Sequence, residues 1–136
     1  MAGYSGTALS KKLALKPGSR LALLGAPAHY LQLLAPMPAD VTRTGRVSVQ
    51  TDVIHLFATS RRVLETGLSR CRKRMRDDAA LWVSWPKKAS KVPTDLTEDV
   101  IREVVLPLGL VDVKVCAVDD IWSALKLVIR KSNRSQ

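Results

Sequence analysis

Basic and hydroxyl side chains crowd one short loop of the sequence, within the stretch "WPKKASKVPT". They are Lys87, Lys88, Ser90, Lys91 and Thr94. Ammonium groups supply positive charge and hydroxyl groups supply directed hydrogen bonds, so these residues could hold a phosphate. The loop lacks the GxxxxGK[ST] frame that wraps a triphosphate. Lysines that are simply solvated on a loop are the alternative interpretation of the same pattern.

Other candidate ligand-binding residues follow two apolar runs elsewhere in the chain. Gly25 follows the run "RLALL", and Thr59, Ser60 and Arg61 follow the run "DVIHLFA". If these runs are parallel strands, their carboxyl ends meet at one edge of the sheet, where such sheets bind ligands. We therefore expect these residues and the lysine loop to converge on an anionic small molecule or an acidic partner. Loops at strand ends are usually polar whatever their role, which is the competing explanation.

The turn after the first apolar run, "LLGAPAHYL", is a poor match to a cofactor-binding loop. Dinucleotide and adenosyl cofactors need two or three glycines so that backbone can approach the ligand, and this turn offers only Gly25. Pro27 removes one backbone N–H that such a loop uses as a donor. No acidic residue clearly follows the next predicted strand, where a ribose hydroxyl is normally held. We therefore predict no cofactor. The alternative, which the turn disfavours, is that S-adenosylmethionine binds through an unusual loop.

The two histidines and two cysteines do not form a recognisable catalytic or metal-binding pattern. His55 lies in the middle of an apolar run, where a buried structural histidine is more frequent than a catalytic base. His29 follows the first turn and could face the ligand crevice, but no carboxylate or nucleophile stands at a recognisable spacing from it. Cys71 and Cys116 lie far apart without a CxxC motif. We expect no metal site and two small, buried cysteines.

The spacing of apolar residues predicts strands that alternate with helices. The predicted strands are residues 20–24, 41–49, 52–58, 80–85, 111–118 and 123–129, and the predicted helices are residues 30–34, 61–75 and 96–106. Thr59 and Ser60 suit the start of the second helix. Asp95 with Glu98 fits a capping box for the third helix. Because residues 119–122 are too few for a crossover helix, the last two strands must pair antiparallel.

These elements indicate an α/β fold, a three-layer Rossmann-like sandwich whose mostly parallel sheet ends in an antiparallel C-terminal hairpin. That ending is typical of class I methyltransferase-like Rossmann folds, a likeness of topology alone. We expect residues 1–18 to form an N-terminal extension, residues 19–131 a single domain and residues 132–136 a polar tail. A chain of 136 residues has room for one hydrophobic core.

The composition bears on partners and on compartment. A count of 22 Lys and Arg against 12 Asp and Glu gives a net charge of +10, which would concentrate polyanions near the protein. Aromatic residues make up only 4%, too few for a platform that stacks single-stranded bases. The basic face of helix 61–75 leaves weak, non-specific nucleic-acid binding as an alternative. No apolar run is long enough to span a membrane and no signal pattern is present, so we expect a cytoplasmic protein.

Several stretches together resemble a known family. They are "AGYSGTALSKKLALKPG", "LALLGAP", "DVIHLFATSR", "LWVSWPKKASKVPTDLTEDVIREV" and "LPLGLVDVKVCAVDDIWSALKLVIRK". They resemble a bacterial family known only as domain of unknown function 3052, over about Met1 to Lys131. The resemblance implies a short cytoplasmic α/β domain and brings no established activity or catalytic residue with it.

The leading hypothesis is a binding domain, non-catalytic or weakly catalytic, that holds an anionic ligand or an acidic partner at the carboxyl edge of its sheet. One alternative is a degenerate S-adenosylmethionine-dependent methyltransferase-like enzyme, which rests on topology. The other is weak, non-specific binding of nucleic acid through the basic helix.

Overall fold

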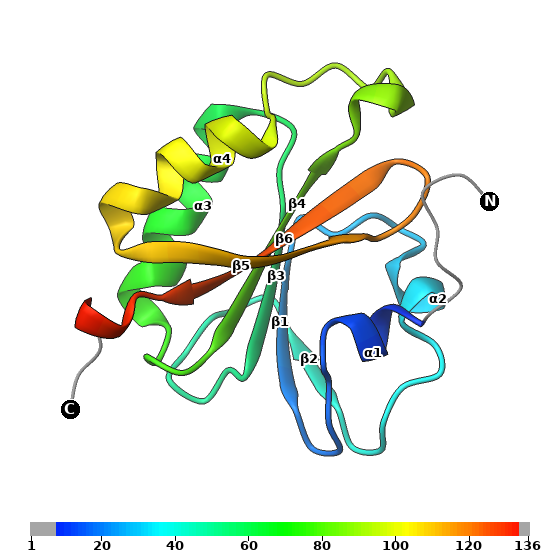
Figure 1. Ribbon diagram of the computed structural model, residues 1–136. Helices are drawn as coiled ribbons and strands as arrows, with labels where there is room; N and C mark the ends of the chain where they lie inside the picture. The colour runs from blue at the N-terminus through cyan, green and yellow to red at the C-terminus, as the bar shows by residue number, and fades with distance from the viewer. Residues whose placement is uncertain (1–7, 134–136) are drawn as a thin grey trace.

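The structure is a computed structural model that describes residues 8–133, so residues 1–7 of the expected extension and 134–136 of the expected tail lie outside the described residues. Figure 1 shows one sheet with helices on both faces. The strands are β1 (Arg20–Leu24), β2 (Thr42–Thr44), β3 (Val53–Phe57), β4 (Ala80–Pro86), β5 (Leu110–Ala117) and β6 (Trp122–Ile129). The α-helices are α1 (Leu9–Lys12), α2 (Tyr30–Leu34), α3 (Arg61–Arg74) and α4 (Glu98–Val105), with 3₁₀ turns at Lys88–Ser90, Leu106–Leu108 and Lys131–Asn133.

The strand order confirms the predicted fold class. The six strands lie in the order β2-β1-β3-β4-β6-β5. β1 pairs parallel with β2 and β3, and β3 pairs parallel with β4. β6 pairs antiparallel with both β4 and β5. The predicted C-terminal hairpin is therefore present, and it places β6 between β4 and β5.

The sheet is covered on both faces because successive side chains of a strand point to opposite sides. All five residues of β3 are buried. Ile54 packs in one cluster with Leu64 of α3, and Phe57 packs in another with Tyr30 of α2. Figure 1 shows α3 and α4 on one face and α1 and α2 on the other. The near-continuous apolar runs of the central strands reflect this double burial.

Residues 8–18 contribute to the core on the face of α1 and α2. Leu9 and Leu13 are buried in the same cluster as Tyr30. Lys12 Nζ donates a hydrogen bond to the backbone carbonyl of Ala117 at 2.7 Å. These contacts attach α1 to both α2 and β5.

The second predicted strand is much shorter than residues 41–49. Only Thr42–Thr44 pairs as β2, and all three residues are exposed. β2 lies at the edge of the sheet, so it has one partner strand and little burial to extend it. After Gly45 the chain leaves the sheet, and Val47 is buried against the core cluster beside α3.

The third predicted helix begins later than expected, because its cap was assigned to the wrong residue. Thr97 is the N-cap of α4, and its Oγ1 accepts a hydrogen bond from the Val100 N–H at 3.2 Å. Asp95, which we expected at that position, accepts a hydrogen bond from the Arg61 N–H at 2.8 Å. Asp95 therefore caps α3, a helix that is distant in the sequence.

Two observations on residues 8–133 concern membranes and metals. Across these residues, each helix is too short or too polar to cross a bilayer. In the same part of the chain, no group of three or more His, Cys, Asp or Glu side chains is placed to hold a metal ion. Both cysteines have free thiols; Cys71 is buried as expected, whereas Cys116 is partly exposed.

Candidate functional site

β1 is the point at which the chain changes the direction in which it adds strands to the sheet. From β1 the chain moves outward to β2, and it then returns across β1 to form β3 on the other side. In open α/β sheets, ligands usually bind in the crevice at the carboxyl ends of the strands that flank such a reversal. Here those strands are β1 and β3, which end at Leu24 and Phe57.

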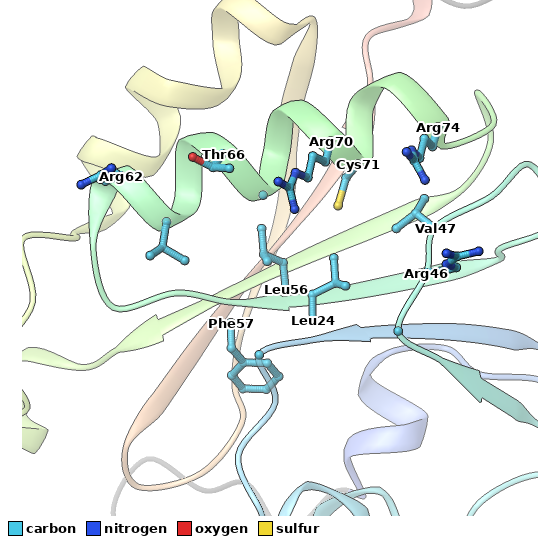
Figure 2. Close-up of a pocket in the computed structure, with 14 residues that line it drawn as sticks. Leu24, Arg46, Val47, Leu56, Phe57, Arg62, Thr66, Arg70, Cys71 and Arg74 are labelled. Carbon is cyan, nitrogen blue, oxygen red and sulfur yellow. The ribbon is translucent and has the colours of Figure 1, made fainter.

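A groove of about 900 Å³ lies at this point, between α3 and the connection from β2 to β3. Figure 2 shows α3 along one side of it, Val47 along the other, and Leu24 and Leu56 between them. The floor is apolar because Leu56 and Leu24 face α3, whereas the Phe57 ring lies on the opposite face of the sheet with Tyr30. We call it the arginine groove because its walls carry four arginines: Arg46, Arg62, Arg70 and Arg74.

The four groove arginines are exposed, and within residues 8–133 none of their guanidinium groups has a hydrogen bond or an ion pair. Other arginines of α3 do have partners. Arg61 pairs with Glu103 at 3.2 Å, and Arg72 Nε donates to the Leu108 carbonyl at 2.9 Å. No Asp or Glu is among the described residues that line the groove. The positive charge of the groove is therefore not compensated by the residues that surround it.

Three of these arginines lie in one row along α3. Arg62, Arg70 and Arg74 share the row with Thr66, and neighbouring members are four positions apart. Side chains at this spacing lie on the same helix face, about 6 Å apart along the axis. Figure 2 shows Arg70 and Arg74 projecting from α3 toward the side where Arg46 lies. The charges thus form a line rather than a single cluster.

Two glycines let the walls approach the floor closely. Gly25 has φ +72°, and a Cβ there would lie 3.0 Å from the carbonyl oxygen of Phe57. A Cβ at Gly67 would lie 3.0 Å from both terminal methyl groups of Leu56. Gly25, predicted as a ligand contact, therefore has a packing role in addition.

Most of the predicted ligand-binding hydroxyls are used in hydrogen bonds that hold the loops. Ser60 Oγ caps α3. Ser90 Oγ donates to the Lys87 carbonyl at 2.6 Å, and Thr94 Oγ1 donates to the Thr59 carbonyl at 2.6 Å. Through the last bond, the loop after β4 contacts the loop after β3.

The predicted basic residues lie near the same edge but do not converge on one point. Lys87 Nζ donates to the Asp119 carbonyl at 2.6 Å, which ties the loop to the β5–β6 turn. Arg61 forms ion pairs with glutamates of α3 and α4. Lys88 and Lys91 are exposed. A phosphate clamp built from these residues and the loop hydroxyls is not assembled here, and their role in ligand binding stays a prediction.

The N-terminus of α3 is also occupied by the protein itself. Asp95 Oδ1 accepts from the Arg61 N–H, and Ser60 Oγ accepts from the Val63 N–H at 3.2 Å. Helix N-termini bind anions through such N–H groups when these are free. An anion at this end of the sheet would therefore be held by arginine side chains rather than by the helix terminus.

One polar pair at the carboxyl edge was not predicted from the sequence. His29 Nε2 lies 2.8 Å from Asp119 Oδ2, although the residues are 90 positions apart. Burial alone would raise the pKa of Asp119, but hydrogen bonds from His29 and from the backbone N–H groups of Trp122 and Ile121 lower it. The pair joins the turn after β1 to the β5–β6 turn. Only the expectation that both turns share one edge could have suggested it.

The second histidine is part of a buried hydrogen-bonded chain, as the sequence predicted for a core residue. His55 Nδ1 lies 2.7 Å from the Tyr30 hydroxyl, and Nε2 lies 2.6 Å from Ser84 Oγ. His55 and Ser84 are fully buried. Burial lowers the pKa of His55 to about 3, so its imidazole is neutral.

Comparisons with known proteins identify the fold. No known family matches the sequence, and no curated protein matches it. Among solved structures, a candidate type 11 methyltransferase from Sulfolobus solfataricus is 12% identical with a TM-score of 0.65, over 94% of this chain and 93% of that chain. A SAM-dependent methyltransferase from Aquifex aeolicus is 14% identical with a TM-score of 0.59, over 89% and 87%. Ribosomal protein L11 methylase from Lactobacillus delbrueckii subsp. bulgaricus is 10% identical with a TM-score of 0.55, over 88% and 74%.

These likenesses show that the chain has a Rossmann-like fold of the methyltransferase type. They agree with the observed sheet, in which an antiparallel hairpin follows four parallel strands. Identities this low show the fold alone. The resemblance to domain of unknown function 3052 has no match among known families and stays a prediction.

The residues at the strand reversal do not fit S-adenosylmethionine in the usual way. β1 is followed by a single glycine, and the carbonyl of Pro27 in the same turn accepts from the Tyr30 N–H at 3.0 Å. Pro27 itself has no N–H to donate to a ligand. β2 is followed by Gly45 and Arg46, so a cation stands where a carboxylate would hold the ribose.

Proposed function

We propose that this protein is a binding domain with a methyltransferase-like fold, and that its ligand is an anionic, partly apolar group held in the arginine groove. The proposal rests on the four uncompensated guanidinium groups beside an apolar floor at the strand reversal. Guanidinium groups bind carboxylates and phosphates through paired hydrogen bonds. The floor formed by Leu24 and Leu56 supplies the apolar contact. The groove volume is in the range of sites that hold small ligands.

The side chains of the groove favour binding over catalysis. Burial raises the pKa of the Cys71 thiol to about 11, so this lining thiol is protonated and a poor nucleophile at neutral pH. The hydroxyl of Thr66 has no histidine or carboxylate among the described lining residues to activate it. Neither group therefore has the environment of a nucleophile.

An aromatic anion, 8-anilinonaphthalene-1-sulfonate, tests the proposal directly because it combines one negative charge with an apolar body. We expect saturable fluorescence enhancement with the wild-type protein. Replacing Arg70→Gln and Arg74→Gln together should weaken the affinity at least about tenfold, equal to 1.4 kcal/mol. Both arginines are exposed and lack partners in residues 8–133, so the double variant should fold normally.

The matched comparison is the double variant Lys88→Gln with Lys91→Gln, which removes the same charge from the loop that the sequence favoured. Its affinity should stay within about twofold of the wild type. A larger loss in the lysine variant than in the arginine variant would move the site to that loop. Failure of the wild-type protein to bind the probe, ATP or pyrophosphate would overturn the proposal.

S-adenosylmethionine-dependent methyl transfer is the second candidate function. The fold comparison on its own favours it, because the similar structures are described as methyltransferases. The arginines of the groove and the single glycine after β1 favour the first candidate. Calorimetry with S-adenosylmethionine and with its demethylated product at millimolar concentration separates the two. Heat with either compound, retained in the Arg70→Gln and Arg74→Gln variant, would support the enzyme.

A further inference from the structure

The connection between β2 and β3 lacks a helix. These two parallel strands flank β1, and the chain passes from one to the other through residues 45–52. Parallel strands are usually joined by a crossover of about a dozen residues or more, most often a helix. Here a short irregular segment makes the crossing, and Val47 is its buried contact with the core beside α3. The arginine groove lies between this segment and α3, on the face where a crossover helix would pack.

The groove has the two surfaces that an amphipathic helix needs. Leu24 and Leu56 form an apolar floor, and the side chain of Val63 on the α3 wall is 50% exposed. These apolar residues can contact the apolar face of a helix. The residues on either side of that face then contact the walls of the groove. The walls carry only positive charge among the described lining residues, so the flanks of the guest must be acidic.

The spacing of the arginines favours a helix over a mononucleotide. The row from Arg62 to Arg74 extends about 18 Å along α3, with neighbouring positions about 6 Å apart. Carboxylates four residues apart on a guest helix that lies beside α3 repeat at the same interval, about 6 Å. Adjacent phosphates of a nucleotide are much closer together and would engage only part of the row. Among the described lining residues the one aromatic, Phe57, has its ring on the opposite face of the sheet, so no aromatic surface is offered to single-stranded bases.

We propose that the arginine groove binds an acidic amphipathic helix of a partner protein, in the place that a crossover helix fills in other parallel sheets. This inference rests on the proposed function, because it specifies the kind of molecule whose negative charge the groove would bind. The apolar face of the guest packs on the floor beside Leu24 and Leu56. Carboxylates at spacing four pair with Arg62, Arg70 and Arg74 on one flank, and a carboxylate on the other flank pairs with Arg46.

Two synthetic peptides of identical composition provide the test. One, of about 18 residues, forms an amphipathic helix with a leucine stripe and glutamates on both flanks. The other has the same residues in an order that spreads leucine and glutamate around the helix. Fluorescence anisotropy at roughly 0.15 M salt limits the general attraction of a protein with net charge +10. We expect the amphipathic peptide to bind at least about tenfold more tightly than the scrambled one.

Matched variants locate the contact. Arg70→Gln with Arg74→Gln should weaken binding of the amphipathic peptide at least about tenfold. Lys73→Gln with Arg130→Gln removes the same charge from exposed positions outside the groove and should change the affinity less than about twofold. Circular dichroism and thermal melts of both variants show whether the fold is kept. Equal losses in the two variants would contradict docking in the groove.

The remaining outcomes separate this inference from the proposed function. If both peptides bind equally and the arginine pair is still required, the groove binds anions but does not select a helix, and the inference is wrong. If neither peptide nor the aromatic anion binds, both proposals are wrong. If a single-stranded oligonucleotide displaces the amphipathic peptide and binds more tightly than it, the partner is a nucleic acid and the inference is again overturned.

Discussion

Val63 lies in the first turn of α3 and also lines the wall of the arginine groove. Its backbone N–H donates to Ser60 Oγ, the N-cap of the helix. A glutamate at this helix position can return a hydrogen bond to the N-cap N–H and complete a capping box. The same carboxylate would add a negative charge to the groove wall that Val63 lines. One substitution can therefore separate the stability of the helix from the charge of the groove.

We expect Val63→Glu to leave the free energy of unfolding unchanged or to raise it by about 0.5 kcal/mol. It should also weaken binding of the aromatic anion at least about tenfold, because it adds a negative charge to the groove. Urea unfolding and fluorescence titration of the same sample measure the two effects. Val63→Gln keeps a similar shape without the charge and should lose much less affinity. Equal losses in both variants would show that the apolar contact, and not the charge, governs binding.

At the level of single residues, the sequence predicted roles that depend on near neighbours and missed those that depend on distant ones. The cap at Ser60 and the burial of His55 follow from the residues beside them, and both are present. Arg62, Arg70 and Arg74 belong to the basic face of helix 61–75 that the sequence indicated, but Arg46 comes from a different segment and was not predicted to join them. The sequence also does not show that Ser90 and similar hydroxyls bond to their own loop backbone.

The segment between β4 and α4 caps two helices that lie far apart in the sequence. Thr97 caps α4, and Asp95 accepts from the first N–H of α3. Thr94 adds a bond to the Thr59 carbonyl, so the segment is attached both to the start of α3 and to the loop before it. Loss of either cap should therefore affect a different helix.

We expect Thr97→Ala to lower the free energy of unfolding by about 1 kcal/mol and to speed amide exchange in the first turn of α4. Asp95→Ala should cause a loss of about the same size, with faster exchange in the first turn of α3 instead. Urea unfolding and amide hydrogen exchange measure these effects. If the Asp95 variant instead showed faster exchange in α4, Asp95 would be the cap of α4, as the sequence suggested. That result would contradict the observed hydrogen bond.

Among the elements, buried ones were predicted well and exposed ones poorly. β3 and β4 are apolar on both faces, and a short continuous apolar run marks such strands clearly. β2 has three exposed residues at the sheet edge, so its extent is set by pairing with β1 rather than by a pattern of its own. The start of α4 was misplaced because Asp95 and Thr97 are equally suitable caps in sequence alone.

At the level of the whole molecule, the stability should depend on pH through His55. This residue is fully buried, so the folded protein disfavours its protonated, charged form. Burial lowers its pKa from 6.5 to about 3. The unfolded chain therefore binds a proton below pH 6.5 that the folded chain does not, and stability falls as the pH falls toward 3.

The free energy of unfolding should be about 2 kcal/mol lower at pH 5 than at pH 7 from this group alone. Urea unfolding across this pH range measures the change. His55→Gln does not titrate and should show a flatter dependence. In the wild-type protein, NMR signals of the His55 ring should stay those of a neutral imidazole at pH 5. Observation of a protonated ring in the folded protein at that pH would contradict the prediction.

The fold class could be predicted because strand spacing and the short 119–122 connection leave few topologies open. The groove could not be predicted, because it forms between α3 and the segment that joins β2 to β3. The sequence does not show that these two parts of the chain face each other. The net charge predicted an affinity for anions in general. The structure adds which arginines already have partners, such as Arg61 and Arg72, and so which positive charges remain for a ligand.

The position of β6 constrains how the protein can form during synthesis. β6 is the last strand of the described chain, yet it lies inside the sheet between β4 and β5. Until Ile129 has left the ribosome, β4 keeps an open edge and β5 has no neighbouring strand. The sheet therefore cannot be completed progressively from the N-terminus, and a nascent chain that stops before Trp122 exposes backbone groups that pair readily with other chains. Completion of the sheet is a late event that requires nearly the entire described chain.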